Sequence, residues 1–287
     1  MNQPFFDLYD DYKKGAMDRR EFFKRLAHLA GGTAAAAALL PLLEGGYAGA
    51  QVVAADDPRL QTGYIEYPAD EGKVRAYSAR PKDSAKHSGV IVIHENRGLN
   101  PHTEDVARRV ALEGYSAVAP DALSPLGGTP SNPDEIRALF QKLDGKANIR
   151  NFVAAVRYLK TDPQSTGKVG CMGFCWGGGV TNQVAVNSPD LAAGVPFYGA
   201  QPAIEDVPKI KASLLIHYAG QDERINAGIP AFEAALKKAA IDYKIFMYEG
   251  AQHAFFNDSN ATRYHKESAQ LAWQRTIDFF KEKLKTG

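Results

Sequence analysis

The sequence predicts a single α/β domain in which helices cover both faces of a mostly parallel sheet. From residue 62 onward, short apolar runs rich in β-branched residues alternate with amphipathic helical stretches, the pattern of repeated strand–helix units. Residues 51–287 have the length of one such domain, and no internal repeat or low-complexity linker divides them. Hydrophobic residues make up 45% of the chain and charged residues 23%, as is ordinary for a globular protein.

The strands are expected where the apolar runs are short and β-branched, at residues 64–67, 74–79, 89–94, 115–119, 168–173, 193–198, 213–219 and 243–248. The first two are expected to form an antiparallel edge of the sheet. The helices are expected at residues 101–113, 134–143, 147–160, 177–187, 228–240 and 264–284. The Pro-, Gly- and Ser-rich residues 122–133 are predicted to form a loop that overhangs a site.

Residues 1–50 differ from the rest of the chain. The pair Arg19-Arg20, an apolar Ala-rich stretch over 26–43 and small residues at 48–50 together resemble a twin-arginine export signal, which predicts a periplasmic protein. Glycines and a proline interrupt the apolar stretch, so no stable membrane span is expected. Two features favour the alternative, a retained N-terminal helix of a cytoplasmic protein. Acidic residues lie near the start of the chain, and Phe23 stands where such a signal usually has leucine.

Charge and cysteine content exclude several classes of function. The net charge of +1 and the lack of long basic runs argue against a nucleic-acid partner. The seven histidines show no metal-ligand spacing. Cys171 and Cys175 would be about 13 Å apart along a strand, too far for a disulfide, so two free thiols are expected. Cys171 is expected to be buried and inert.

The segment Gly173-Phe174-Cys175-Trp176-Gly177 joins a predicted strand to a predicted helix. It has the G-x-S-x-G form of a nucleophile elbow, with cysteine in place of serine. A Cβ at either glycine would collide with neighbouring backbone, and Cys175 itself is expected in a strained conformation. The following helix points its N-terminal amides at Cys175, which predicts a thiol pKa below the ordinary value. Cys175 is therefore the candidate nucleophile.

A carboxylate and a histidine follow later strands, in the chain order nucleophile, acid, base that such a site requires. Asp222 follows the next-to-last predicted strand, and His253 follows the last one. We expect His253 to accept the thiol proton and later to protonate the leaving group, while Asp222 fixes the tautomer of the imidazole. Glu223 and Asp206 remain alternative acids, and His217, inside an apolar strand, is expected to be a core residue.

A third segment follows the first predicted parallel strand, where this type of site takes its second oxyanion-hole amide. We assign the two oxyanion donors to the backbone N–H groups of Asn96 and Trp176. Glu95 follows the same buried strand and is therefore expected to lie near Cys175.

Three of these segments, HENRG at 94–98, GFCWGGG at 173–179 and AQHAFFND at 251–258, together resemble the dienelactone hydrolase family, also called carboxymethylenebutenolidases. The resemblance extends from about residue 60 to the C-terminus. It implies an α/β-hydrolase fold and hydrolysis of a small ester or lactone through a thioester intermediate. It also implies that neither a metal nor an organic cofactor is needed.

The resemblance assigns the family's catalytic set to Cys175, His253 and Asp222. It further implies that Glu95 interacts with the cysteine and helps to control its ionisation. Two alternatives stay open: a non-catalytic member of the fold that binds a ligand, and an acyltransferase or peptidase that uses the same triad. The oligomeric state does not follow from the sequence.

One position departs from the family pattern. The dienelactone enzyme proper holds the carboxylate of its substrate with arginines, one of them at the fourth position after the catalytic histidine. Here that position is Asn257, and the nearest arginine is Arg263. Arg97 and Arg263 are the candidate substrate-binding residues, and the chlorocatechol-pathway substrate of the family is not carried over.

Overall fold

The computed structural model describes residues 8–9, 11–12, 17–33, 35–37, 52–70 and 72–285. Internal contacts divide the chain into two compact units, residues 1–51 and residues 52–287.

The first unit contains helix α2 (Arg19–Ala30), which begins at the N-cap Asp18 and ends at Gly31 in the left-handed conformation. Phe22 and Leu26 are buried on one side of this helix. The small residues at 48–50 and the end of the predicted apolar stretch lie outside the described residues. Within the described residues, no helix combines the length and the apolarity that crossing a membrane requires.

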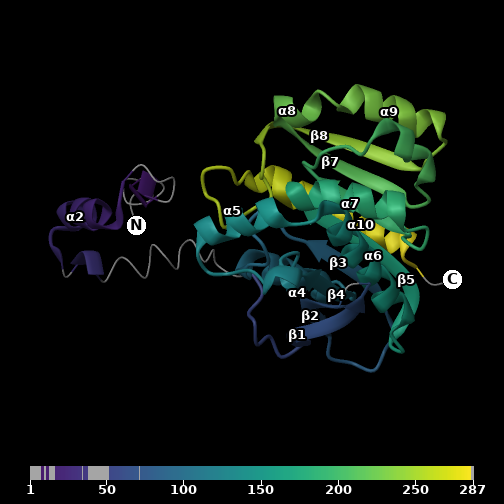
Figure 1. The fold of residues 1–287 in the computed structure, drawn as a ribbon, viewed down its shortest axis with the longest axis horizontal. Coiled ribbons are helices and arrows are strands. Elements are labelled where there is room, and N and C mark those ends of the chain that lie inside the picture. The colour runs from purple at the N-terminus through teal and green to yellow at the C-terminus, as the bar shows by residue number, and fades with distance from the viewer. Residues whose placement is uncertain are drawn as a thin grey trace. The chain divides into compact units, whose positions relative to one another are not determined.

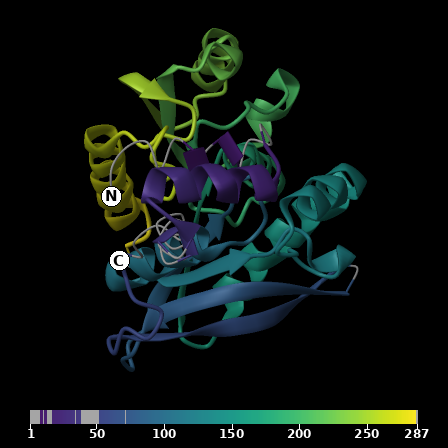
Figure 2. The same cartoon turned by 90° about the vertical axis from the view of Figure 1, so that its left-hand side faces the viewer.

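The second unit is built on one eight-stranded sheet with the order β1-β2-β4-β3-β5-β6-β7-β8 (Figure 1). Its strands are β1 (Leu60–Ala69), β2 (Gly72–Pro81), β3 (His87–Ile93), β4 (Ser116–Pro120), β5 (Ser165–Phe174), β6 (Ala193–Phe197), β7 (Ser213–Gln221) and β8 (Tyr243–Gln252). β1 and β2 pair antiparallel at one edge, β2 also runs antiparallel to β4, and every other described pair is parallel. The long β1–β2 hairpin and β8 lie at opposite edges (Figure 2). The predicted single α/β domain with an antiparallel edge is confirmed.

Helices cover both faces of this sheet. They are α4 (Pro101–Leu112), α5 (Pro133–Lys142), α6 (Gly145–Thr161), α7 (Trp176–Asn187), α8 (Glu223–Asn226), α9 (Ile229–Lys238) and α10 (Lys266–Lys283). Two 3-10 turns, η1 (Ser124–Leu126) and η2 (Ile204–Lys209), complete the unit. The two turns and α8 were not predicted, because elements of three to six residues are too short to show a periodic pattern.

Alternation along the strands divides the core into two layers. In β3, Val90 and Val92 pack with α4 and α10, whereas Ile91 and Ile93 pack with α6, α7 and α9 on the other face. Successive side chains of a strand point to opposite faces, so a strand buried on both sides must be apolar throughout. This explains the continuous apolar run at residues 90–93. Polar residues follow only after the strand ends, at the edge of the sheet.

Candidate active site

Cys175 occupies a sharp turn between β5 and α7. Its backbone angles are φ 55° and ψ −114°, a region that residues with a side chain rarely adopt. A Cβ on Gly173 would lie 2.2 Å from the carbonyl oxygen of Gly177, and a Cβ on Gly177 would lie 2.4 Å from the carbonyl oxygen of His94. Backbone atoms cannot easily move aside, so both positions require glycine, as the sequence predicts.

Replacement of Gly177 by alanine is expected to lower the free energy of unfolding by about 3 kcal/mol or more, because the new methyl group would overlap backbone carbonyls. Gly179, in the same helix, provides a matched control. Its Cβ would first meet the backbone nitrogen of Ala200 at 3.5 Å, an ordinary contact, so Gly179→Ala is expected to be neutral or to stabilise by up to about 1 kcal/mol. Urea unfolding compares the two variants, and equal effects would contradict the tight turn.

The environment of the Cys175 thiol opposes ionisation. Burial, followed by the charge of the Glu95 carboxylate, raises the pKa of this thiol to about 11, and Asp222 adds to the increase. The nearby backbone N–H of Trp176 and the guanidinium of Arg224 lower this pKa, but by less. The predicted lowering of the pKa is therefore wrong, because desolvation and a nearby carboxylate outweigh the helix amides.

The rate at which iodoacetamide alkylates Cys175 is expected to rise with pH up to about 11, because the thiolate is the reactive species. Glu95→Gln keeps the shape of the side chain but removes its negative charge. The profile of this variant is therefore expected to move to lower pH by about one pH unit. Peptide mass spectrometry separates Cys175 from Cys171, whose burial raises its pKa to about 12. An unchanged profile in Glu95→Gln would show that the carboxylate does not act on the thiol.

Asp222 and His253 meet because β7 and β8 are adjacent parallel strands. Gln221 pairs with Gln252 at the ends of these strands, so the residues that follow face each other. Nδ1 of His253 lies 2.5 Å from Oδ2 of Asp222, whose side chain is only 7% exposed. An ionised carboxylate only accepts hydrogen bonds, so Nδ1 carries the proton and Nε2 keeps its lone pair. This is the arrangement of a general base held by an orienting acid.

The alternative acids do not reach the histidine. Among the described residues, Asp206 pairs with Lys209 at 2.6 Å and Glu223 is exposed, and neither has a contact with His253. His217 is a fully buried core residue, as predicted. It forms hydrogen bonds with two hydroxyl groups, and burial lowers its pKa to about 3.

Tyr198, which follows β6, was not predicted as part of the site. It is fully buried and has a positive φ of 38°. The centroid of its ring lies 5.1 Å from that of His253, and its hydroxyl oxygen lies 3.5 Å from Oε1 of Glu95. The sequence predicts a strand over 193–198 that includes Tyr198, whereas β6 ends at Phe197. Tyr198 therefore lies just beyond the strand, at the same edge as Asp222 and His253.

The site residues thus occupy the carboxyl ends of neighbouring strands. Across the sheet in the order β3, β5, β6, β7 and β8, the residues at or just beyond the strand ends are Glu95, Cys175, Tyr198, Asp222 and His253. In open α/β sheets this edge is where ligands bind, because polar groups there are free of the sheet's hydrogen bonding.

His94 holds the segment that carries Glu95 and Asn96. It is fully buried, with Nδ1 2.6 Å from the carbonyl oxygen of Glu95, while Nε2 accepts a hydrogen bond from the backbone N–H of Ala122. The ring is therefore neutral, with its proton on Nδ1, in agreement with the lowering of its pKa by burial. It stacks on the Trp176 ring at a centroid distance of 5.4 Å, which ties this segment to the nucleophile turn.

The two predicted oxyanion donors have amides that remain available. Trp176 is the first residue of α7, so its N–H has no acceptor within the helix. Among the hydrogen bonds of the described residues, this N–H has no acceptor elsewhere in the protein either. Among the hydrogen bonds of the described residues, the N–H of Asn96 has no protein acceptor. Their role in binding an oxyanion stays a prediction.

The two predicted substrate-binding arginines have no described contact with the site residues. Arg97 and Arg263 are exposed, and no described hydrogen bond or ion pair links either side chain to Cys175 or its partners. Their assignment stays a prediction. Arg224 is instead the cation that acts on the Cys175 thiol. It was missed because it lies in the four-residue helix α8, which gives no sequence signal.

The Pro-, Gly- and Ser-rich loop before α5 lies beside the segment that follows β3. The Thr129 hydroxyl donates to Oδ1 of Asp121 at 2.7 Å and accepts from the backbone N–H of Leu99 at 3.1 Å. Phe140 of α5 packs edge-on against the Trp176 ring at a centroid distance of 5.1 Å. The hydrogen bonds of Thr129 tie this loop to the segment after β3, and Phe140 ties α5 to the first residue after Cys175.

The structure also contains a cavity that lies away from these site residues. A cavity of about 290 Å³ lies against β1, β2, β4 and α6 and includes none of the site residues. In the parts of the chain that the structure describes, no three His, Cys, Asp or Glu side chains are grouped as metal ligands.

Comparisons with known proteins agree with the resemblance. A model of the dienelactone hydrolase family matches residues 74–284. A protein of Saccharolobus solfataricus, provisionally assigned as a carboxymethylenebutenolidase, is 33% identical over 255 residues, which cover 76% of this chain and 97% of that protein. The protein usf of Aquifex pyrophilus is 36% identical over 237 residues, covering 77% of this chain and 98% of that protein.

A solved structure extends the similarity to three dimensions. The crystal structure of a provisionally assigned dienelactone hydrolase from Klebsiella pneumoniae has a TM-score of 0.71 and 28% sequence identity, and the match covers 77% of this chain and 98% of that one. Because the family match spans most of the second unit and the relatives match over nearly their whole length, the chain belongs to the dienelactone hydrolase family of α/β-hydrolase enzymes.

Proposed function

We propose that this protein hydrolyses a small ester or lactone through a Cys175–His253–Asp222 triad and a thioester intermediate. One observation carries the proposal: the candidate nucleophile lies in a strained turn at the same sheet edge as a His253–Asp222 pair joined at 2.5 Å. Family membership supports the hydrolase class, and the geometry supports the roles of the individual residues.

The first step is attack of the Cys175 sulfur on the carbonyl carbon. Because the thiol pKa is raised, the sulfur is protonated at neutral pH and must lose its proton as it attacks. The Nε2 lone pair of His253 accepts this proton, and Asp222 stabilises the imidazolium that forms. The charge of the Glu95 carboxylate favours the protonated form of the thiol.

The tetrahedral intermediate carries a negative charge on the former carbonyl oxygen. The backbone N–H groups of Asn96 and Trp176 donate to this oxygen, and each such donor typically contributes about 10²–10³ in rate. The C–O bond to the leaving group breaks, and the imidazolium of His253 gives its proton to the departing alkoxide. A thioester on Cys175 and a free alcohol result.

Water completes the reaction. His253, now neutral, takes a proton from a water molecule that attacks the thioester carbonyl. The C–S bond then breaks to release a carboxylic acid, and the imidazolium of His253 gives its proton to the departing sulfur, which regenerates the thiol. For a lactone, the alcohol and the acid belong to one molecule, so the product is a hydroxy acid.

A substrate screen tests the proposed function. The purified protein is expected to hydrolyse p-nitrophenyl acetate and members of a panel of lactones and short-chain esters, followed by release of nitrophenol or of acid. Alkylation of Cys175 with iodoacetamide at high pH is expected to stop turnover. If an enzyme alkylated at Cys175 retains its rate, or if no ester or lactone in the panel is cleaved, the proposal fails.

We also propose that residues 1–50 direct export by the twin-arginine route. Arg19 and Arg20 are exposed in the first turn of α2, which supports their recognition by an export receptor. Cell fractionation of the wild type and of the Arg19→Lys, Arg20→Lys double variant tests this. We expect the wild type in the periplasm and the double variant in the cytoplasm. A wild type found in the cytoplasm would contradict export.

A further inference from the structure

The side chain of Asn257 has a fixed orientation. Its Oδ1 accepts hydrogen bonds from the backbone N–H of Ser259 at 3.1 Å and from the Ser259 hydroxyl at 2.5 Å. Only the carbonyl end of an amide can accept from an N–H, so the amino end must point the other way. There, Nδ2 donates to Oε2 of Glu95 at 3.1 Å. Asn257 is 9% exposed, so little water competes for these bonds.

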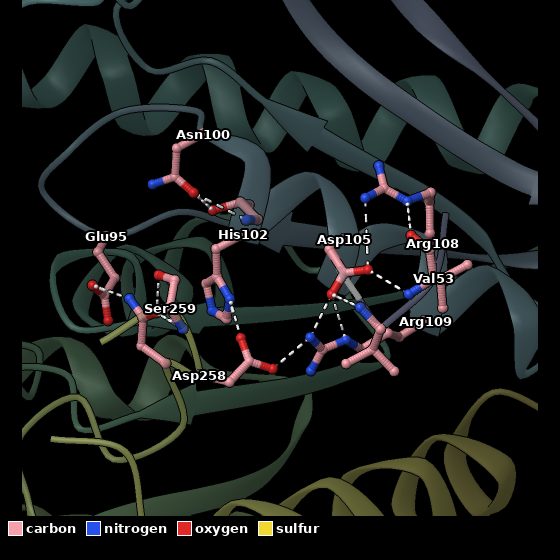
Figure 3. A network of polar contacts seen from close by, with 12 residues as sticks. Val53, Glu95, Asn100, His102, Asp105, Arg108, Arg109, Asp258 and Ser259 are labelled. Atoms are coloured by element: carbon pink, nitrogen blue, oxygen red, sulfur yellow. Dashed lines mark hydrogen bonds and ion pairs between the residues drawn. The ribbon is translucent and has the colours of Figure 1, made fainter. Parts of the chain in front are cut away.

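The loop that carries His253 and Asn257 is tied to the segment of Glu95 at a second point. Asp258 accepts from Nδ1 of His102 at 2.9 Å and from Nη2 of Arg109 at 2.5 Å, and both of these residues lie on α4. Helix α4 begins shortly after Glu95, so the two chain segments are joined at consecutive residues of one loop. In Figure 3, Asp258 lies between His102 and Arg109 and has a dashed line to each of them, and Glu95 and Ser259 lie beside His102.

We propose that Asn257 is a positioning residue that fixes the Glu95 carboxylate beside the Cys175 thiol. This inference deepens the proposed function and rests on Cys175 being its nucleophile. The other donor to Glu95, the Tyr198 hydroxyl, lies at 3.5 Å and forms a weak bond at most, so Asn257 supplies the main contact.

The neutral character of Asn257 matters for the electrostatics of the site. A carboxylate held by an amide keeps its full charge, whereas a cation at the same position would neutralise it. The uncompensated charge of Glu95 is, after burial, the largest cause of the raised pKa of Cys175. The hydrogen bond from Asn257 therefore determines where this charge lies relative to the sulfur.

The pH profile of Cys175 alkylation tests the inference without requiring turnover. In Asn257→Ala the carboxylate loses its main donor and is free to turn toward solvent. The profile is then expected to move to lower pH by about one pH unit, toward that of Glu95→Gln. Asn260→Ala makes the same chemical change in the same loop, at a residue with no described contact to Glu95, and is expected to match the wild type.

A second variant provides a shift of opposite sign. Asn257→Asp keeps the oxygen that accepts from Ser259 but places a second carboxylate against Glu95. The added negative charge is expected to move the profile to higher pH. Both variants remove the hydrogen bond to Glu95, but only Asn257→Asp adds a negative charge near the sulfur. A general loosening of the loop would shift both profiles in the same direction. Shifts of the same sign in the two variants would overturn the inference.

A double-mutant cycle isolates the contact from other effects of the substitution. In a Glu95→Gln background, Asn257→Ala is expected to cause no further shift, because there is no charge left to position. An equal shift in both backgrounds would show that Asn257 acts independently of Glu95. If the alkylation profiles behave as expected but the screened esters are not cleaved, the proposed function fails while the positioning role holds.

Discussion

Cys175→Ala is expected to reduce kcat/KM for p-nitrophenyl acetate by about 10⁴ or more, the loss seen when the nucleophile of a triad is removed. The methyl group of alanine cannot form the thioester, and neither His253 nor Asp222 can replace it. The fold is expected to persist, because alanine tolerates the space that the partly buried side chain occupied. Stopped-flow or steady-state release of nitrophenol measures the effect.

Cys171→Ala is the matched control for this experiment. Cys171 is fully buried in β5, where its sulfur lies 3.7 Å from the Thr181 hydroxyl, and it faces the core and not the site edge. Its removal is expected to leave kcat/KM within about twofold of the wild type, with a small loss of stability. A Cys175→Ala enzyme that turns over at the wild-type rate would show that another group is the nucleophile.

Asp222→Asn is expected to lower kcat by about 10³ to 10⁴, with a smaller change in KM. The carboxylate at 2.5 Å keeps the proton of His253 on Nδ1 and supports the imidazolium that forms during attack. An amide of nearly the same shape can turn its N–H toward the ring, which favours the wrong tautomer and leaves Nε2 protonated. The measurement is the pH dependence of kcat and KM in both enzymes.

Glu223→Gln is the matched control for this second variant. It makes the same change from carboxylate to amide at the next residue, which is exposed at the start of α8. We expect its kcat to stay close to that of the wild type. Equal losses in the two variants would point to a general effect of negative charge near α8 and would contradict the specific pairing of Asp222 with His253.

Much of the site follows from the positions of residues relative to strands. Asp222 and His253 could be predicted because each follows an apolar strand, and parallel strands end at one edge of the sheet. The register Gln221–Gln252 then brings them together. Tyr198 satisfies the same rule in the structure, but the sequence predicts it as the last residue of the strand over 193–198, because its apolar ring continues that strand's pattern.

Other features depend on contacts between distant segments that no local pattern reveals. The pKa of Cys175 is one of them, since it reflects the balance between helix amides, burial and the charge of Glu95. The local sequence pattern shows only the helix amides. The contact between Asn257 and Glu95 is another, because it joins residues 162 positions apart. The position of Asn257 was recognised as unusual for the family, but its partner became apparent only in the structure.

The central claim is that the acyl group of the substrate is transferred to the sulfur of Cys175. The most direct test is rapid acid quenching of the enzyme with p-nitrophenyl acetate, followed by digestion and peptide mass spectrometry. Acid conditions preserve thioesters. The account predicts an acetyl group on the peptide that contains Cys175, formed within the first turnover and absent after Cys175→Ala. Rapid nitrophenol release with the acetyl group on a different residue would contradict it.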